Sequence, residues 1–295
     1  MKTGVITDGI SRDLDHALSV MSEFGLEFAE IQFVWNREIG DHTKEENHLI
    51  KELLAKHGKR VSCLSRHLFA PLTSANRPGD SLHNSQMEAL RRVIGLAQSL
   101  GSPLVRVMSP KKEMILWGEG GAEVWNVAGG AWDSALELMA PAADLARREN
   151  MTLVMETGNG IIVNSNYAAR RMIDDLDAKD CLKTLWDPAN CCWCHELAWP
   201  DAYEEVRNGY LGHIHIKDVQ VDTPRSHLAV REYGQGQLAL LFPKIAAALA
   251  GDGYGGVVSF ESVYHPGNGS FEDGFRACIA GFLGDFGPRG MGTSQ

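Results

Sequence analysis

The sequence has no long uninterrupted hydrophobic run and no excess of positive charge. Its longest apolar stretch, LALLFPKIAAALA, is interrupted by Pro243 and Lys244, so we expect no membrane-spanning segment and no membrane partner. The opening segment, MKTGVITDGI, lacks the apolar region and the small-residue cleavage pattern of a secretory signal. The formal net charge of −10 argues against a nucleic-acid partner, because phosphate backbones attract basic surfaces.

Cysteine is also scarce, with six residues in a chain of 295 and no regular spacing between them. This usage does not fit the disulfide framework of a small secreted protein. The chain is 44% hydrophobic, which is enough apolar material to bury a full core without disulfides or structural metals. We therefore expect a reduced protein that resides in the cytoplasm.

The sequence does contain a repeated alternation of short apolar runs and amphipathic helical segments. This alternation predicts a parallel sheet covered by helices, and eight repeats favour a closed (β/α)8 TIM barrel of the α/β class over an open sheet. No change of composition marks a domain boundary, so we expect a single barrel domain over residues 1–286 and a flexible C-terminal tail over 287–295. The predicted strands lie within residues 3–11, 28–35, 61–65, 103–109, 151–157, 182–188, 211–218 and 255–262.

Two helices and two connections carry further expectations. Pro141 lies inside the helix predicted over 131–150, and we expect it to kink or split that helix. Another helix is predicted over 238–253. The connections at 110–130 and 219–237 are long and punctuated by glycine, which is typical of loops that cover an active site.

The last four predicted strands each end in, or carry, a side chain that can bind a metal. In a closed parallel barrel the carboxyl ends of the strands meet at one rim, where active sites lie. Two glutamates, one aspartate and one histidine form a ligand set that is typical of Mn²⁺, Mg²⁺, Fe²⁺ or Co²⁺ and less typical of a thiolate zinc site. The alternative is that each acid caps the following helix or pairs with an arginine. The four residues are Glu156, Asp187, His215 and Glu261.

The order of these residues resembles a known family. The succession Glu, Asp, His, Glu on strands five to eight, together with DPAN, HIHIKD and GQG, is similar to the sugar phosphate isomerase/epimerase group of xylose isomerase-like TIM barrels. The opening GVITDGIS fits as well, so the resemblance covers nearly the whole chain. It implies that Glu156, Asp187, His215 and Glu261 are metal ligands. Within HIHIKD the second histidine matches the ligand position, which leaves His213 as a core or supporting residue.

The resemblance also implies an activity. We expect a divalent-metal-dependent isomerase or epimerase that acts on a small sugar or keto-polyol through an enediolate, with Mn²⁺ as the first expectation and Mg²⁺, Co²⁺ or Fe²⁺ as alternatives. Glu156 and Glu261 would serve as base and acid. The alternative is a metal-dependent lyase or hydrolase acting on a 3-keto-glycoside, or a dehydratase acting on an inositol-type ketone, at the same site. A homo-oligomer stays open.

Two positions depart from the ketose 3-epimerase pattern. Those enzymes usually carry a histidine three residues after the metal-binding aspartate, where this chain has Asn190. They also tend to carry a second glutamate six residues after the first, where this chain has Ile162. We therefore expect a substrate other than a simple ketohexose. Endonuclease IV-like repair fits less well because it needs additional histidine ligands, and a Schiff-base aldolase using Lys217 would leave the acids unexplained.

Four further side chains are candidates for substrate contact. His67 follows strand three, and its alternative role is that of a satisfied loop histidine. Arg106 on strand four could hold a substrate oxygen or pair with a buried acid. Asn190 could contact substrate or orient Asp187. Lys217 projects from the same strand as the histidine ligand and could contact an anionic oxygen.

Other polar and aromatic residues are open to a structural interpretation. Glu30, in strand two, could bind substrate or cap a helix, and we favour a structural role. Trp35, Trp117 and Trp186 could form an apolar wall for a sugar face, although aromatic residues in such folds usually pack in the core.

The segment DPANCCWCHE, residues 187–196, resembles a metal site because of its cysteines. A structural zinc site needs two pairs of ligands, and this segment offers only adjacent Cys191 and Cys192 and a C-x-C pair with Cys194. Side chains of adjacent residues diverge. We therefore expect the cysteines to pack near strand six, and the metal to belong to Asp187.

Overall fold

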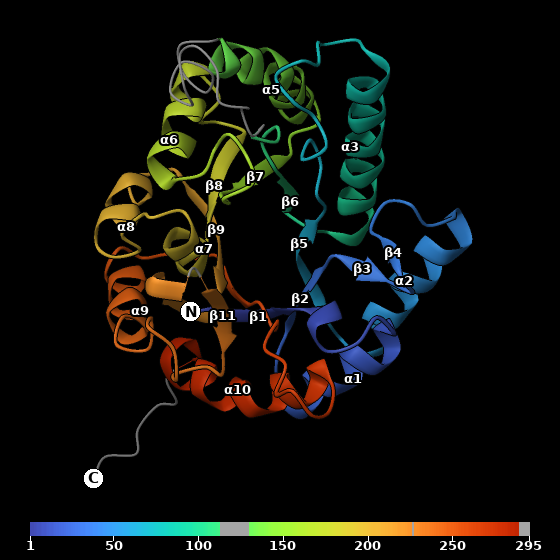
Figure 1. The fold of residues 1–295 in the computed structure, drawn as a ribbon. Coiled ribbons are helices and arrows are strands. Elements are labelled where there is room, and N and C mark those ends of the chain that lie inside the picture. The colour runs from blue at the N-terminus through green and yellow to red at the C-terminus, as the bar shows by residue number, and fades with distance from the viewer. Residues whose placement is uncertain (113–129, 226, 289–295) are drawn as a thin grey trace.

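A closed parallel barrel organises the chain, as seen in a computed structural model that describes residues 1–112, 130–225 and 227–288. Within these residues eight parallel strands pair in the order β1-β12-β9-β8-β7-β6-β5-β2, and β2 pairs with β1 to close the circle (Figure 1). The predicted α/β single-domain (β/α)8 barrel is confirmed. The strands are β1 (Lys2–Ile6), β2 (Phe28–Ile31), β5 (Arg60–Ser65), β6 (Leu104–Val107), β7 (Thr152–Glu156), β8 (Leu182–Trp186), β9 (Leu211–Ile216) and β12 (Val257–Phe260).

Helices surround the barrel on its outer side (Figure 1). Several begin at a polar residue that satisfies free backbone amides: Asp13 accepts from two amides of the first turn of its helix, and Thr43 forms a capping box with Glu46. Among the described residues no helix has the length and apolar character needed to span a bilayer. The helices are α1 (Leu14–Glu23), α2 (Lys44–Lys56), α3 (Ser81–Leu100), α5 (Ala131–Arg148), α6 (Asn166–Asp175), α7 (Pro188–Trp193), α8 (Asp201–Val206), α9 (Phe242–Gly251) and α10 (Phe271–Phe286).

Two helices that contain a proline differ from the helices expected from the sequence. α5 runs from Ala131 to Arg148 without being split at Pro141. α9 begins only at Phe242, so the helix predicted over 238–253 is shorter at its start. Pro243 therefore lies in the first turn, where its missing amide costs no helical hydrogen bond.

The segment predicted as a long loop at 219–237 contains an antiparallel hairpin. β10 (Asp218–Asp222) and β11 (His227–Arg231) form it, with a short 3-10 turn, η3 (Thr223–Arg225), near its tip. The Asp218 carboxylate holds its base by accepting hydrogen bonds from the amides of Gly234, Gly236 and Leu238. A second small hairpin pairs β3 (Phe33–Val34) with β4 (Arg37–Glu38). Most of the other predicted loop, and the predicted tail from 289 onward, lie outside the described residues.

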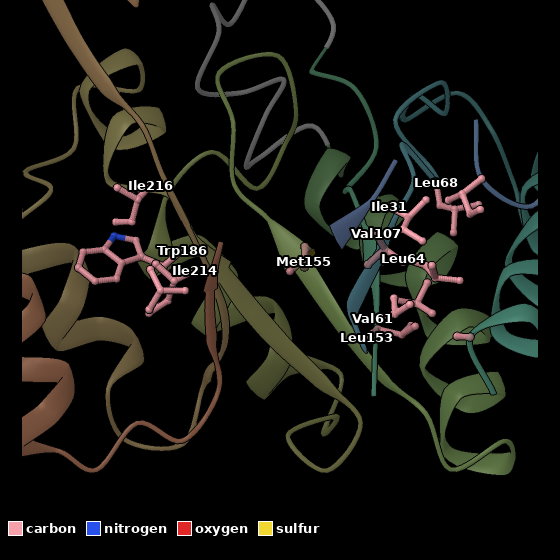
Figure 2. Packing of buried hydrophobic residues seen from close by; sticks show 14 of the residues in the cluster. Ile31, Val61, Leu64, Leu68, Val107, Leu153, Met155, Trp186, Ile214 and Ile216 are labelled. Atoms are coloured by element: carbon pink, nitrogen blue, oxygen red, sulfur yellow. The ribbon is translucent and has the colours of Figure 1, made fainter. Parts of the chain in front are cut away.

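The apolar core has two parts. The larger part lies between the strands and the helices, and Figure 2 shows strand residues of this layer, among them Val107, Met155, Trp186 and Ile214. A separate small cluster joins Cys63, Val154 and Leu185. Successive residues of a strand point to opposite faces of the sheet. Val154 therefore faces the barrel interior, as do Cys63 and Leu185, while Met155 faces the helices.

Above this small cluster the interior of the barrel is polar. The inward-pointing residues nearer the carboxyl ends of the strands are buried and hydrophilic. The interior of such barrels is usually filled by layers of branched apolar side chains. A buried polar layer costs stability unless its members bond one another, so its presence at the carboxyl ends of the strands indicates a function. The members include Glu30, Ser65, Arg106, Glu156, His213 and His215.

Candidate metal centre

Four side chains predicted from the sequence to be ligands come together at the rim of the barrel. Glu156 ends β7, Asp187 follows β8, His215 lies in β9 and Glu261 follows β12, and these four strands are neighbours in the sheet. One potential ligand atom from each residue lies within 4.8 Å of those of the other three. The barrel thus places three carboxylates and one imidazole around a common point.

Asp187 both caps a helix and faces the cluster. Its Oδ1 accepts hydrogen bonds from the backbone amides of Ala189, at 2.9 Å, and Asn190, at 3.4 Å, which starts α7. Its Oδ2 accepts from the Lys217 ammonium. Burial raises the pKa of Asp187 to about 6; the Lys217 charge opposes this rise and the Glu261 charge adds to it. Capping and metal binding are therefore compatible here, because they use different oxygens.

Glu156 is held from two sides. Its Oε2 accepts from Arg106 Nη1 at 2.8 Å, and its Oε1 accepts from Asn190 Nδ2 at 3.2 Å. Burial alone would raise the pKa of Glu156, but the nearby Arg106 and His215 charges outweigh it and leave the pKa lowered. The side chain is thus an ionised carboxylate with a fixed orientation. Asn190 Nδ2 also donates to the carbonyl oxygen of Thr157, at 3.0 Å. The side-chain amide of Asn190 therefore orients Glu156, whereas only its backbone amide bonds Asp187.

His215 presents one ring nitrogen to the cluster. Its Nε2 lies 2.8 Å from Glu30 Oε1, whereas its Nδ1 lies 3.6 Å from Glu156 Oε1 and 3.7 Å from Glu261 Oε2. This buried Nδ1 has no hydrogen-bond partner within the described parts of the chain. Burial would lower the pKa of His215, but the Glu30 and Glu156 carboxylates raise it to about 10.

Lys217 neutralises part of the carboxylate charge. Its Nζ donates to Asp187 Oδ2 and, at 2.5 Å, to Glu261 Oε2, and lies 5.2 Å from the ring centroid of Trp193. Burial would lower the pKa of Lys217, but the charges of Asp187 and Glu261 raise it above its usual value. Lys217 is therefore a charged ammonium that bonds two of the four rim carboxylate and imidazole residues.

The residues present fit a divalent ion. An oxygen-rich set with one nitrogen is the donor chemistry of Mn²⁺, Mg²⁺, Fe²⁺ or Co²⁺ sites that keep positions open for substrate. The unpartnered Nδ1 of His215 supplies the nitrogen. A second group with ligand chemistry, Glu30, His213 and His215, lies deeper in the barrel and shares the same histidine.

A cavity of about 530 Å³ opens above the cluster. All four predicted substrate-contact residues line it, and so do two of the predicted ligands. A smaller cavity of about 190 Å³ adjoins it and shares Gln32, Glu261 and Val263 with it. The lining of the larger cavity includes His67, Arg106, Asn190, Lys217, Glu156 and Glu261.

His67 and Arg106 occupy the cavity wall in different ways. His67 is half-exposed, and its Nδ1 lies 2.8 Å from Glu38 Oε1, which orients the ring. Arg106 is buried and uses Nη1 for Glu156, while its Nε and Nη2 have no partner among the described residues. Of the two roles foreseen for Arg106, the pairing with a buried acid is seen in the structure, and the contact with a substrate oxygen stays a prediction.

The aromatic wall differs from the sequence-based interpretation. Trp186 is fully buried beside Tyr203, and the Trp35 ring packs against His42, so neither is among the described residues that line the cavity. Trp117 lies outside the described residues. Trp193, which the sequence analysis did not select, lines the cavity instead. Its position at the end of α7, six residues after Asp187, is the signal that could have identified it.

The cysteines near Asp187 stay outside the metal group. All six cysteines of the chain are free, and none belongs to a group that could hold a metal among the described residues. Cys191 is buried in the core and accepts from Asn166 Nδ2 at 3.3 Å. Burial raises the pKa of Cys192 to about 11 and that of Cys194 to about 12, so both are protonated thiols at neutral pH. This agrees with the expectation that sulfur does not form the site.

The fold and the rim together define a (β/α)8 barrel with an acid-rich centre at the carboxyl ends of its strands. Residues 18–280 match the family described as xylose isomerase-like TIM barrel, and the chain belongs to that family. This confirms the resemblance drawn from the sequence. No curated protein sequence matches the chain significantly.

Solved structures share the architecture at low sequence identity. The IOLI protein with a bound zinc atom is 17% identical with a TM-score of 0.71, covering 97% of this chain and 98% of that one. D-psicose 3-epimerase from Clostridium cellulolyticum H10, solved with D-tagatose, is 16% identical with a TM-score of 0.66, covering 95% and 92%. The probable 3-DHS dehydratase AsbF from Bacillus anthracis is 13% identical with a TM-score of 0.69, covering 94% and 98%. These likenesses concern the fold.

Proposed function

We propose that the protein is a divalent-metal-dependent isomerase or epimerase that acts on a keto-sugar or keto-polyol through an enediolate. The observation that carries the proposal is the convergence of three carboxylates and one imidazole, within 4.8 Å of one another, beneath a cavity of about 530 Å³. That cavity is within the range that holds small-molecule ligands. The family membership and the epimerase among the similar structures support the same reaction class.

Glu156, Asp187, His215 and Glu261 would hold the ion. When bound, a divalent ion supplies the positive charge that stabilises the negative oxygen of an enediolate. Mn²⁺ is our first expectation for this oxygen-rich set, with Mg²⁺, Co²⁺ or Fe²⁺ as alternatives. The zinc of the IOLI structure supports a divalent ion without favouring Mn²⁺ in particular.

The two glutamates differ in a way that suits proton transfer. Glu156 is held ionised by Arg106 and would take the proton from carbon as a base. Glu261 is less buried, faces the cavity and bonds the Lys217 ammonium, so a proton can reach it and be returned to the substrate. Return to the opposite face of the same carbon gives an epimer, and return to the former carbonyl carbon moves the carbonyl group to the carbon that lost its proton.

The remaining cavity residues would bind the substrate. Arg106, His67 and Lys217 line the cavity and would contact substrate oxygens. Asn190 would act chiefly by holding Glu156 in place. A cytoplasmic location, a homo-oligomeric state and the lack of a nucleic-acid partner stay predictions.

Hydrogen exchange at carbon tests the proposal. Purified, Mn²⁺-loaded protein is incubated in D₂O with a panel of keto-sugars, keto-polyols and 3-keto-glycosides, and the products are analysed by NMR and mass spectrometry. We expect deuterium incorporation with a change of configuration or of carbonyl position. The chelator-treated protein is the control. Loss of a leaving group would instead assign the lyase or dehydratase alternative, whose fold-level example is AsbF. If no ketone in the panel exchanged, the enediolate mechanism would be wrong.

A further inference from the structure

Glu30 lies in β2, beneath the candidate metal centre, and bonds both histidines of β9. Its Oε1 lies 2.8 Å from His215 Nε2, and its Oε2 lies 2.8 Å from His213 Nε2. Ser65 donates a third hydrogen bond, to Oε1. Glu30, His213 and His215 are fully buried, and Glu30 is not among the described residues that line either cavity.

The Glu30 carboxylate determines which ring nitrogen of His213 and of His215 carries the proton. An ionised carboxylate only accepts hydrogen bonds, so both imidazoles must donate from Nε2. In neutral His215 the lone pair then lies on Nδ1, which is the nitrogen directed toward Glu156 and Glu261. Carboxylates that bond the far nitrogen of a histidine ligand fix its tautomer and ring orientation in metal sites.

We propose that Glu30 is the positioning residue that makes His215 a metal ligand, by fixing both the tautomer and the orientation of its ring. The inference rests on the proposed metal-dependent function, because it concerns how the ligand set is prepared for an ion. It assigns to Glu30 a role different from the purely structural one expected from the sequence.

The deeper group could alternatively be a second metal site, since Glu30, His213 and His215 have ligand chemistry. Against this, each Nε2 is already at hydrogen-bond distance from a different oxygen of the same carboxylate, and Ser65 also donates to it. The two Nε2 atoms and both oxygens of Glu30 are thus used by one another. A hydrogen-bonded support accounts for the arrangement without an ion.

The two histidines provide a matched comparison. They make equivalent hydrogen bonds with the two oxygens of Glu30, yet only His215 belongs to the rim group. The Nδ1 of His213, in contrast, has no partner in the described residues and no place in that group. Replacement of Glu30 should therefore weaken metal binding, whereas replacement of His213 by glutamine keeps a donor near Nε2 and should leave the rim intact.

The test uses full-length wild-type protein and the Glu30→Gln, Glu30→Asp and His213→Gln variants. Mn²⁺ affinity is measured by titration calorimetry, Co²⁺ coordination by its visible absorption, and folding by circular dichroism. We expect Glu30→Gln to weaken Mn²⁺ binding by about 10–100-fold and to change the Co²⁺ spectrum. We expect His213→Gln to weaken Mn²⁺ binding by less than about 10-fold.

The order of the two Glu30 variants separates positioning from packing. Glutamine matches glutamate in shape but carries donors that allow the wrong histidine tautomer, whereas aspartate is shorter but still only accepts. A packing role therefore predicts tighter Mn²⁺ binding in Glu30→Gln, and a positioning role predicts tighter binding in Glu30→Asp. If Glu30→Gln fails to fold, the comparison of Glu30→Asp with His213→Gln still decides, because only the former alters the bond to His215 directly.

The outcomes distinguish this inference from the proposed function. Wild-type protein that binds no divalent ion would contradict the proposed function itself. Wild-type protein that binds one ion, together with a Glu30→Gln variant of equal affinity and unchanged Co²⁺ spectrum, would overturn only the role of Glu30. Two ions bound per wild-type chain would also overturn it, because Glu30 would then be a ligand.

Discussion

The two halves of the barrel contribute different kinds of side chain to the same centre. In the half formed by β7, β8, β9 and β12, every strand delivers a potential metal ligand to the rim. In the half formed by β1, β2, β5 and β6, Glu30 and Arg106 are buried near the centre without joining the rim group. Each instead bonds one ligand, His215 or Glu156. One half thus supplies the ligands together with Asn190 and Lys217, and the other supplies the buried Glu30 and Arg106 that bond two of those ligands.

The largest effect is expected from the ligand half. Asp187→Asn keeps an oxygen to cap α7 but removes the carboxylate charge, so we expect metal affinity to fall by more than the roughly 10–100-fold typical of residues that support a ligand. Metal content of the purified variant, measured by elemental analysis, checks this. Cys194→Ser, in the same segment, is the matched control and should keep the wild-type metal content. An Asp187→Asn variant with full occupancy would show that the ligand set is wrong.

The next effect separates the two glutamates of the ligand half. Glu156→Gln and Glu261→Gln should each reduce turnover by about 10²–10⁴-fold at saturating metal, because each would transfer one proton. In deuterated water, Glu261→Gln should still exchange the substrate proton more readily than it forms product, since the base Glu156 remains. Steady-state rates and exchange rates, measured side by side, provide the comparison. Wild-type-like turnover in either variant would refute the acid–base pair.

A smaller effect on catalysis but a clear effect on stability is expected from the support half. Arg106→Met leaves Glu156 buried without its cation, and loss of one partner of a buried ion pair costs about 3–5 kcal/mol in the free energy of unfolding. Urea denaturation at several pH values measures it. Metal-free protein should be used, so that ion binding does not compensate.

The pH dependence of that loss has a definite sign. In the wild type the pKa of Glu156 is lowered, so its contribution to stability is present above the usual glutamate value of about 4.5 and is lost as the pH falls through the folded value. Without Arg106, burial dominates and the pKa of Glu156 should rise. The difference in the free energy of unfolding between wild type and Arg106→Met should therefore be larger at pH 8 than at pH 5. A difference independent of pH would mean that the ion pair is not its source.

Much of the ligand half could be predicted because its signals are local. An apolar strand followed by an acid is visible in MTLVMET, LKTLWDP and GGVVSFES, and the barrel brings such strand ends together. Strand parity could also have placed Trp186, since it immediately precedes Asp187 and must point to the opposite face. The structure accordingly buries Trp186 among the helices.

The support half could not be predicted in the same way, because its interactions are distant in sequence. The bond between Glu30 and His215 joins residues 185 positions apart, and nothing in FAEIQ indicates which side chain the glutamate meets. Arg106 could be placed on its strand, but its choice of Glu156 depends on the register between β6 and β7. The role of Trp193 depends on α7 beginning at Pro188, which turns the ring toward the cavity.

Closure of the barrel has a consequence for the order in which the protein assembles. Glu30 lies in β2 and Glu261 follows β12, and β1 joins these two strands in the closed sheet. The complete centre therefore requires the N-terminal and the C-terminal parts of the barrel to be in place together. An ion that binds this centre would favour the closed barrel over every open intermediate, by about 2.7 kcal/mol at a hundredfold excess over its dissociation constant. The stability of the closed barrel would then depend on the concentration of the metal ion.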